Sequence, residues 1–164
     1  MKKGFTLIEV IFAIFLVTVT AFAAFTLIDN TLVAVSSNKI GLTAYYLAQE
    51  GIELVRNIRD NNWLESRTGS VAWNDGLAAG DWEMDYNDTA LSAYTSRYLY
   101  LENSTKLFSY IESPNSLDEE TKFQRKITIS DLSSDIIEVK ITVYWVERSR
   151  THRIEVISQL TNWK

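Results

Sequence analysis

The chain has 164 residues, of which 16 are Lys or Arg and 21 are Asp or Glu, so its formal net charge is −5. Because nucleic acid is itself negatively charged, we expect the monomer not to bind it nonspecifically. The chain has no cysteine, which excludes disulfides and cysteine-bound metals. Its length allows one long helix and one domain of about 100 residues.

The first element in chain order is an apolar segment that follows a short basic start. Lys2 and Lys3 precede Gly4, and residues 5–28 carry no charge except that of Glu9. As a helix, this segment would be about 36 Å long, enough to cross a hydrocarbon core of about 30 Å. A carboxylate inside such a segment costs at least ~2.5–3.5 kcal/mol on insertion scales, and less near its end. The presence of Glu9 in this segment therefore indicates that its carboxylate has a binding partner or a specific function.

Two ordinary explanations of this segment have to be weighed. A secretory signal has the same basic start and apolar run, and Ala21-Phe22-Ala23 matches its cleavage pattern. A plain membrane anchor for a soluble binding domain or enzyme has the same length. However, Glu9 interrupts the apolar run expected of a signal, and the run continues to Ile28. An anchor has no use for the carboxylate, so both explanations leave Glu9 without a role.

The sequence GFTLIEV at residues 4–10 resembles the processing site of type IV prepilins and the related pseudopilins. In that family a short basic leader ends in glycine and is followed by a spanning apolar helix with an early glutamate. The resemblance implies that a prepilin peptidase cuts between Gly4 and Phe5 and that Phe5 becomes N-methylated. It also implies that Glu9 meets the free amine of a neighbouring subunit's Phe5 as the filament assembles.

On this resemblance, the chain is expected to be a minor pilin or pseudopilin, a structural subunit of a type IV pilus-like filament, and not an enzyme. The alternative within the family is a pseudopilin of a type II secretion or competence DNA-uptake system. The expected partners are prepilin peptidase, membrane lipid before assembly, and other pilin subunits through helix packing. Lys2 and Lys3 should stay in the cytoplasm. We therefore expect a single-pass protein of the cytoplasmic (inner) membrane with its C-terminal domain outside, and afterwards an extracellular or periplasmic filament.

The next segment, residues 29–62, has the pattern of an amphipathic helix. Apolar or small residues recur there at steps of three or four, at Ile40, Ala44, Leu47, Gly51, Leu54 and Ile58. Because no proline interrupts residues 5–62, one continuous helix is predicted. The predicted organisation is a leader at 1–4, a transmembrane or filament-core half of the helix at 5–28, an amphipathic half at 29–62 and a globular antiparallel β domain at 63–164. This α+β fold, a long helix packed on an antiparallel sheet, is the type IV pilin-like architecture that the resemblance implies.

The C-terminal part of the chain predicts an antiparallel sheet. Three long strands are expected at residues 123–130, 136–147 and 153–161, and their connections are short and polar, which is typical of a meander. Residues 97–101 and 107–111 predict a hairpin. Shorter strands are expected at 71–73 and 82–86.

Within the β domain, Asp81, Glu83 and Asp85 form the candidate metal site. Carboxylates at this density could bind calcium, as some pseudopilins do in a loop, although the spacing does not match an EF-hand. On a strand at residues 82–86 the three side chains would share the solvent face, so a solvated acidic face is the favoured interpretation. We expect no other cofactor. His152 is expected to be an ordinary surface histidine, because no nucleophile or metal-ligand spacing accompanies it.

Overall fold

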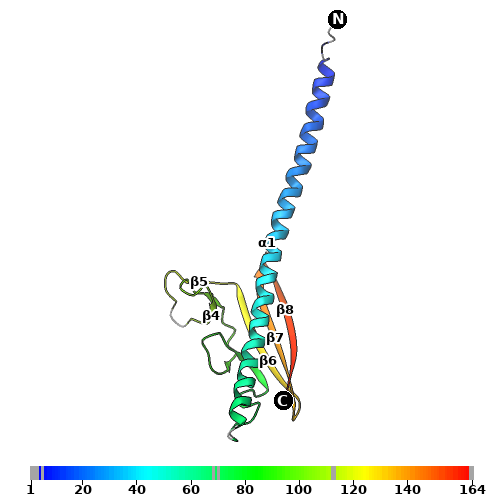
Figure 1. Cartoon of the computed structure of the whole chain (residues 1–164). Coiled ribbons are helices and arrows are strands. Elements are labelled where there is room, and N and C mark those ends of the chain that lie inside the picture. Colours follow the sequence, from blue (N-terminus) through cyan, green and yellow to red (C-terminus); the bar gives the residue numbers. More distant parts are fainter. Residues whose placement is uncertain (1–3, 5, 68, 70, 112–113, 163–164) are drawn as a thin grey trace. The chain divides into compact units, whose positions relative to one another are not determined.

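The computed structural model describes residues 4, 6–67, 69, 71–111 and 114–162. In chain order, its elements are α1 (Leu7–Ser66), β1 (Gly80–Glu83), β2 (Ser92–Ala93), β3 (Tyr100–Leu101), β4 (Phe108–Ser109), β5 (Glu119–Glu120), β6 (Phe123–Ser133), β7 (Ile136–Glu147) and β8 (Arg150–Thr161). The predicted α+β layout is confirmed: the chain has one long, N-terminally apolar helix that packs on an antiparallel sheet (Figure 1).

The chain divides into two compact units, Met1–Gly41 and Leu42–Lys164. The first holds the N-terminal part of α1, and the second holds the remainder of α1 together with the strands. The helix continues without a break through Gly41 and ends at Ser66, four residues beyond the predicted stop at residue 62. Asn61 and Asn62 are both helical, and Asn62 donates to the carbonyls of Trp73 and Asp75 in the following loop.

The main sheet has five strands in the order β2-β1-β6-β7-β8, and each neighbouring pair is antiparallel. The predicted meander of three long strands is therefore confirmed. Ile127 of β6 lies opposite Ile141 of β7, which in turn lies opposite Val156 of β8. A register shift between Asp131 and Ser133 extends β6 beyond its predicted end at residue 130.

One face of this sheet and one stripe of α1 form the core of the second unit. The buried stripe recurs at helical spacing and consists of Ala44, Leu47, Ala48, Gly51, Ile52 and Val55. Alternate residues of the central strands face it, namely Ile127 and Ile129 of β6 and Ile137, Val139, Ile141 and Val143 of β7. In Figure 1, β6, β7 and β8 lie alongside the C-terminal part of α1. Leu54 and Ile58, which were predicted in the stripe, lie at its margin and are half-buried.

A second, smaller sheet has the order β4-β3-β5. It contains the predicted hairpin, since Tyr100 and Leu101 pair with Ser109 and Phe108. Residues 71–73, predicted as a strand, form a bend and turn instead. The strand predicted at residues 82–86 is displaced to Gly80–Glu83.

Candidate functional site

The carboxylate of Glu9 is held at the N-terminal end of α1 by Thr6. The backbone N–H and the hydroxyl of Thr6 both donate to Oε2 of Glu9, at 2.9 and 2.8 Å, and the N–H of Glu9 points back to Oγ1 of Thr6 at 3.4 Å. This reciprocal arrangement is a capping box, in which two side chains satisfy backbone donors that a helix start leaves free. Glu9 thus has an intrachain role that the sequence analysis missed, although the spacing Thr-x-x-Glu before an apolar run is its signal.

Gly4, the residue before the expected cut, is exposed, and an added Cβ there would have no atom within 4 Å. Phe5, where N-methylation is expected, lies outside the described residues.

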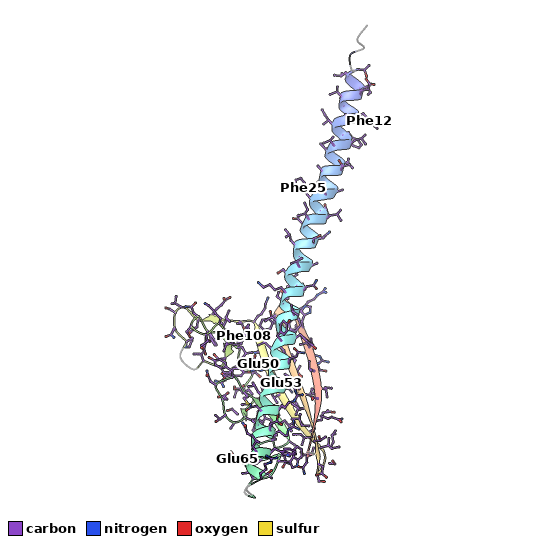
Figure 2. All side chains as sticks on the ribbon, in the orientation of Figure 1. Phe12, Phe25, Glu50, Glu53, Glu65 and Phe108 are labelled. Atoms are coloured by element: carbon purple, nitrogen blue, oxygen red, sulfur yellow. The ribbon has the colours of Figure 1, made fainter. Side chains whose placement is uncertain are left out.

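The N-terminal part of α1 presents an apolar surface on all its sides. Each residue from 7 to 36 is exposed, and the large apolar side chains among them include Leu7, Ile11, Phe12, Phe15, Phe22 and Phe25. Figure 2 shows Phe12 and Phe25 projecting outward from this segment. Within the described residues, α1 is the one helix that is long and apolar enough to cross a membrane. Those properties alone also fit a signal sequence.

The threonine hydroxyls of this segment are satisfied within the helix itself. Thr18, Thr20, Thr26 and Thr31 each donate to a backbone carbonyl three or four residues earlier, at 2.8 to 3.0 Å. A hydroxyl paired in this way does not present an unmet donor to hydrocarbon. These threonines can therefore lie in lipid or against other apolar helices without losing hydrogen bonds.

The prediction that Asp81, Glu83 and Asp85 form a solvated acidic face is wrong, because the three carboxylates do not share a solvent face. Glu83 is 1% exposed, and its carboxylate accepts hydrogen bonds from Arg97 at 2.8 and 2.5 Å and from the N–H and hydroxyl of Thr95 at 3.0 Å. Glu83 is in phase with the exposed Asp81 on β1, and it is buried because the later segment that carries Thr95 and Arg97 encloses it. The buried charge persists because it is paired and hydrogen-bonded.

Asp85 and Asp81 have separate partners. Asp85 is 4% exposed and accepts from the backbone N–H groups of Tyr110 and Asn87 at 2.6 and 2.8 Å. Asp81 is exposed and accepts from Thr128 and Lys126, and the hydrogen bond from Thr128 lowers the pKa of its carboxyl. Among the described residues, no group of three or more His, Cys, Asp or Glu is placed to hold a metal ion.

Arg125 is a further residue that the sequence analysis missed. It lies on the core-facing side of β6 and is fully buried, and its guanidinium donates to the carbonyls of Leu47 in α1 and Met84 after β1, at 3.1 and 2.6 Å. Glu50 of α1, labelled in Figure 2, lies 3.4 Å from Nη1. The sequence pattern that could have predicted its burial is FQRKITI at residues 123–129, in which Arg125 alternates in phase with the apolar residues.

His152 is exposed and stacks on Trp145 across the β7–β8 pair, with ring centroids 5.5 Å apart.

Comparison of the chain with protein-family models, curated proteins and solved structures finds no match. The functional argument therefore rests on the N-terminal segment of α1 and the residues around Glu9.

Proposed function

We propose that this chain is a structural subunit, a minor pilin or pseudopilin, of a type IV pilus-like filament. A prepilin peptidase would remove residues 1–4 and Phe5 would be N-methylated, after which the chain would assemble through its apolar N-terminal helix. The observation that carries the proposal is the apolar surface of residues 10–28, exposed on all sides of α1, together with the GFTLIEV sequence at residues 4–10.

An apolar surface of this extent needs a covering environment. Burying one large apolar side chain is worth roughly 1.5–3 kcal/mol, and many such side chains are exposed here. Lipid provides that environment for a single subunit, and a bundle of equivalent helices provides it in a filament. The proposed function uses both in succession: the helix resides in the cytoplasmic (inner) membrane with the β domain outside, and then enters the filament core.

Glu9 distinguishes a filament subunit from a passive anchor. In the single chain its carboxylate is bound by Thr6 at an exposed helix end, which needs no second subunit. Inside a helix bundle the carboxylate would lose water and require a cation. Residues 10–28 contain no Lys or Arg, so the α-amine that cleavage creates on a neighbouring Phe5 is the available partner. Breaking a buried pair of this kind costs ~3–5 kcal/mol.

The processing step is tested by intact mass and N-terminal sequencing of chain extracted from membranes that contain a prepilin peptidase. We expect the mature chain to begin at Phe5 and to carry one added methyl group. Gly4→Val should block the cut, because it puts a branched side chain beside the scissile bond, whereas Gly41→Ala should be processed normally. A mature chain beginning at Ala24 would identify an ordinary secretory signal and contradict the proposal.

The role of Glu9 is tested by a series that separates its charge from its capping function. Glu9→Gln keeps an N3 side chain able to complete the capping box but removes the negative charge, Thr6→Val removes the capping partner but keeps the charge, and Glu9→Val removes both functions of Glu9. If the carboxylate pairs with a neighbour's amine, Glu9→Gln and Glu9→Val should both enter sheared filaments at least about tenfold less than the parent chain. Thr6→Val should enter at close to the parent level.

Normal incorporation of Glu9→Gln would show that the residue serves only as a helix cap. No filament in any condition, with the β domain folded and active in binding, would favour the competing function of a non-polymerising membrane-anchored domain. A pseudopilin of a type II secretion or competence DNA-uptake system would give the same results as a minor pilin in the processing test and in the Glu9 test. The two differ only in the machinery that the filament serves.

A further inference from the structure

Two small cavities on the β domain share the side chain of Tyr98. One, of about 200 Å³, is lined by Arg97, Tyr98, Tyr100, Tyr110, Ile111 and Glu120. The other, of about 150 Å³, is lined by Tyr98, Lys122, Gln124, Tyr144, Trp145, Val146 and Thr151. Both are open to solvent and smaller than sites for drug-sized ligands, which occupy roughly 300 Å³ or more. Their size and adjacency fit a ligand made of two small linked units.

The extended backbone before and within β3 places the shared tyrosine at the surface. Leu99 is fully buried, and alternation turns its neighbours Tyr98 and Tyr100 to the opposite side. Leu99 is fixed by backbone hydrogen bonds, since its N–H donates to Phe123 and its carbonyl accepts from Thr121, both at 2.9 Å. The two tyrosines therefore project from a braced segment, which reduces the entropy lost when a ligand orders them.

The polar groups of the first cavity are also held in place. Arg97 donates from Nε and Nη2 to the buried carboxylate of Glu83, and its guanidinium lies 5.0 Å from the ring centroid of Tyr110. Tyr100 donates from its hydroxyl to Glu120 at 2.7 Å, across the β3–β5 pair. Because both Arg97 contacts with Glu83 use the Nε–Nη2 side, the Nη1 side of the guanidinium is turned away from that carboxylate.

This combination of groups matches the chemistry of a sugar. A pyranose ring has C–H faces that stack on the electron-rich face of an aromatic ring, and it has hydroxyl groups around its rim that pair with carboxylate, guanidinium and amide groups. Tyr98 supplies an exposed ring and Tyr100 a half-buried one, and Arg97, Glu120 and Gln124 supply the polar groups. From this geometry we infer that the β domain binds a neutral oligosaccharide, with adjacent sugar units in the two cavities on either side of Tyr98.

The local charge explains why the ligand should be neutral. Arg97 is neutralised by Glu83, and the two cavities together carry one further acid, Glu120, and one further base, Lys122, so the formal charges around the site sum to zero. The tyrosines are amphipathic, with an apolar ring and a polar tip, which suits a ligand that alternates C–H and hydroxyl groups. The site lies on the second unit and does not depend on the proposed filament function.

The inference is tested with the full chain in a zwitterionic detergent, because sugar-based detergents would compete for the site. A panel of cellobiose, lactose, maltose, mannobiose and N,N′-diacetylchitobiose is titrated by ligand-observed NMR. We expect at least one disaccharide to bind with Kd near ~1 mM, and its trisaccharide to bind no more than a few-fold tighter, because the two cavities accept two units. Heparin-derived and sialylated oligosaccharides serve as anionic comparisons.

Substitutions locate the site. Tyr98→Ala should weaken binding at least about tenfold, whereas Tyr98→Phe, which keeps the ring, should weaken it only a few-fold. Tyr46→Ala removes an exposed tyrosine from α1 that lines neither cavity, and should leave Kd unchanged. Because Tyr98 is exposed, the variants should melt at the parent temperature, which is checked for each. The inference is overturned if no neutral disaccharide binds at ~10 mM, if Tyr98→Ala binds like the parent, or if an anionic oligosaccharide binds best.

Discussion

Arg125 occupies a position on β6 where the alternation of the strand calls for an apolar side chain. Its neighbours on the same face, Phe123 and Ile127, are buried in the core, and the guanidinium joins α1, β6 and the chain after β1 by bonding two backbone carbonyls. Nη1 and Nη2 make these two bonds, which offset part of the cost of burying the charge, whereas the buried Nε has no hydrogen-bond partner among the described residues. Arg125 therefore links elements that are distant in sequence.

Arg125→Ala should destabilise the second unit by about 3–5 kcal/mol, because two buried carbonyls lose their donor and a large side chain leaves a cavity. Chemical unfolding in detergent micelles measures the loss. Lys126→Ala is the matched control: its exposed ion pair with Asp81 lies on the other face of β6, and its loss should cost no more than ~1 kcal/mol. An equal loss of unfolding free energy in the two variants would show that the contacts of Arg125 do not stabilise the second unit.

Tyr110 links the loop before β5 to the sheet. Its hydroxyl donates to the carbonyl of Arg125 at 2.9 Å, and burial of the phenol raises its pKa to about 12. The folded pKa exceeds the unfolded value of 10.0, so the stabilisation is fully present below pH 10 and is lost as the pH rises through about 12.

Tyr110→Phe should therefore cost about 0.5–1.5 kcal/mol at neutral pH, through loss of one hydrogen bond, and should flatten the fall of stability between pH 10 and 12. The measurement is a series of unfolding curves across that pH range. Tyr46→Phe, on an exposed tyrosine, should leave the pH profile unchanged. A profile that Tyr110→Phe also leaves unchanged would mean that another group controls alkaline unfolding.

At the scale of the element, the two glycines inside α1 have opposite surroundings. A Cβ on Gly51 would lie 3.0 Å from Cγ2 of Ile141 and 3.3 Å from Cδ of Arg125, so its absence lets the helix approach β7 closely. A Cβ on Gly41 would have nothing within 4 Å. Glycine is therefore required for packing at position 51, whereas at position 41 it only lowers the intrinsic stability of the helix.

Gly51→Val should destabilise the second unit by more than about 2 kcal/mol, because the added branches overlap the core. Gly41→Ala should instead stabilise the helix by roughly 0.5–1 kcal/mol, since it removes only the backbone freedom of glycine. Thermal unfolding followed by circular dichroism compares the two. Both substitutions raising the melting temperature would contradict the close packing at Gly51.

The β7–β8 turn is another element with a measurable strain. Arg148 and Ser149 have φ values of 52° and 61°, the left-handed backbone that a two-residue hairpin turn requires and that Asn-Gly adopts more readily. The double substitution Arg148→Asn and Ser149→Gly should stabilise the hairpin by about 1–2 kcal/mol. Ser134→Gly, in the β6–β7 connection, should give no gain, because Ser134 does not have a positive φ. A melting temperature unchanged by the double substitution would rule out strain at this turn.

At the scale of the whole molecule, the apolar surface and the apolar core lie in different units. The buried hydrophobic residues that form the core run from Ala44 to Leu160, within the second unit, whereas the exposed apolar residues of α1 are concentrated in the first. The part of the chain that folds around itself is thus separable from the part that needs lipid or other helices.

A shortened chain that begins at Leu42 should therefore fold and remain monomeric in water without detergent. Its unfolding transition should lie within a few degrees of that of the second unit in the full chain, because no core residue has been removed. The full chain should require detergent or lipid to stay dispersed. Aggregation of the shortened chain would show that the first unit contributes to the fold of the second, and sedimentation with circular dichroism gives the answer.

The sequence by itself was enough to predict the helix, the three long strands and their antiparallel order. These follow from local patterns: an unbroken apolar run without proline, alternation along strands, and short polar connections that allow only neighbouring strands to pair. The resemblance at residues 4–10 and the position of Glu9 were also evident from the sequence alone. The pilin-like function remains a prediction.

The tertiary structure alone decided the surroundings of the charged side chains. Glu83 and Asp85 were predicted on a solvent face and are buried, because residues from distant segments enclose them: Thr95 and Arg97 bond Glu83, and the backbone of Tyr110 bonds Asp85. Their partners Arg97 and Tyr110 come from segments with no local sequence signal for the contact, as do the carbonyls that Arg125 binds. Burial and pairing of a charge depend on long-range packing, which periodicity along the chain does not encode.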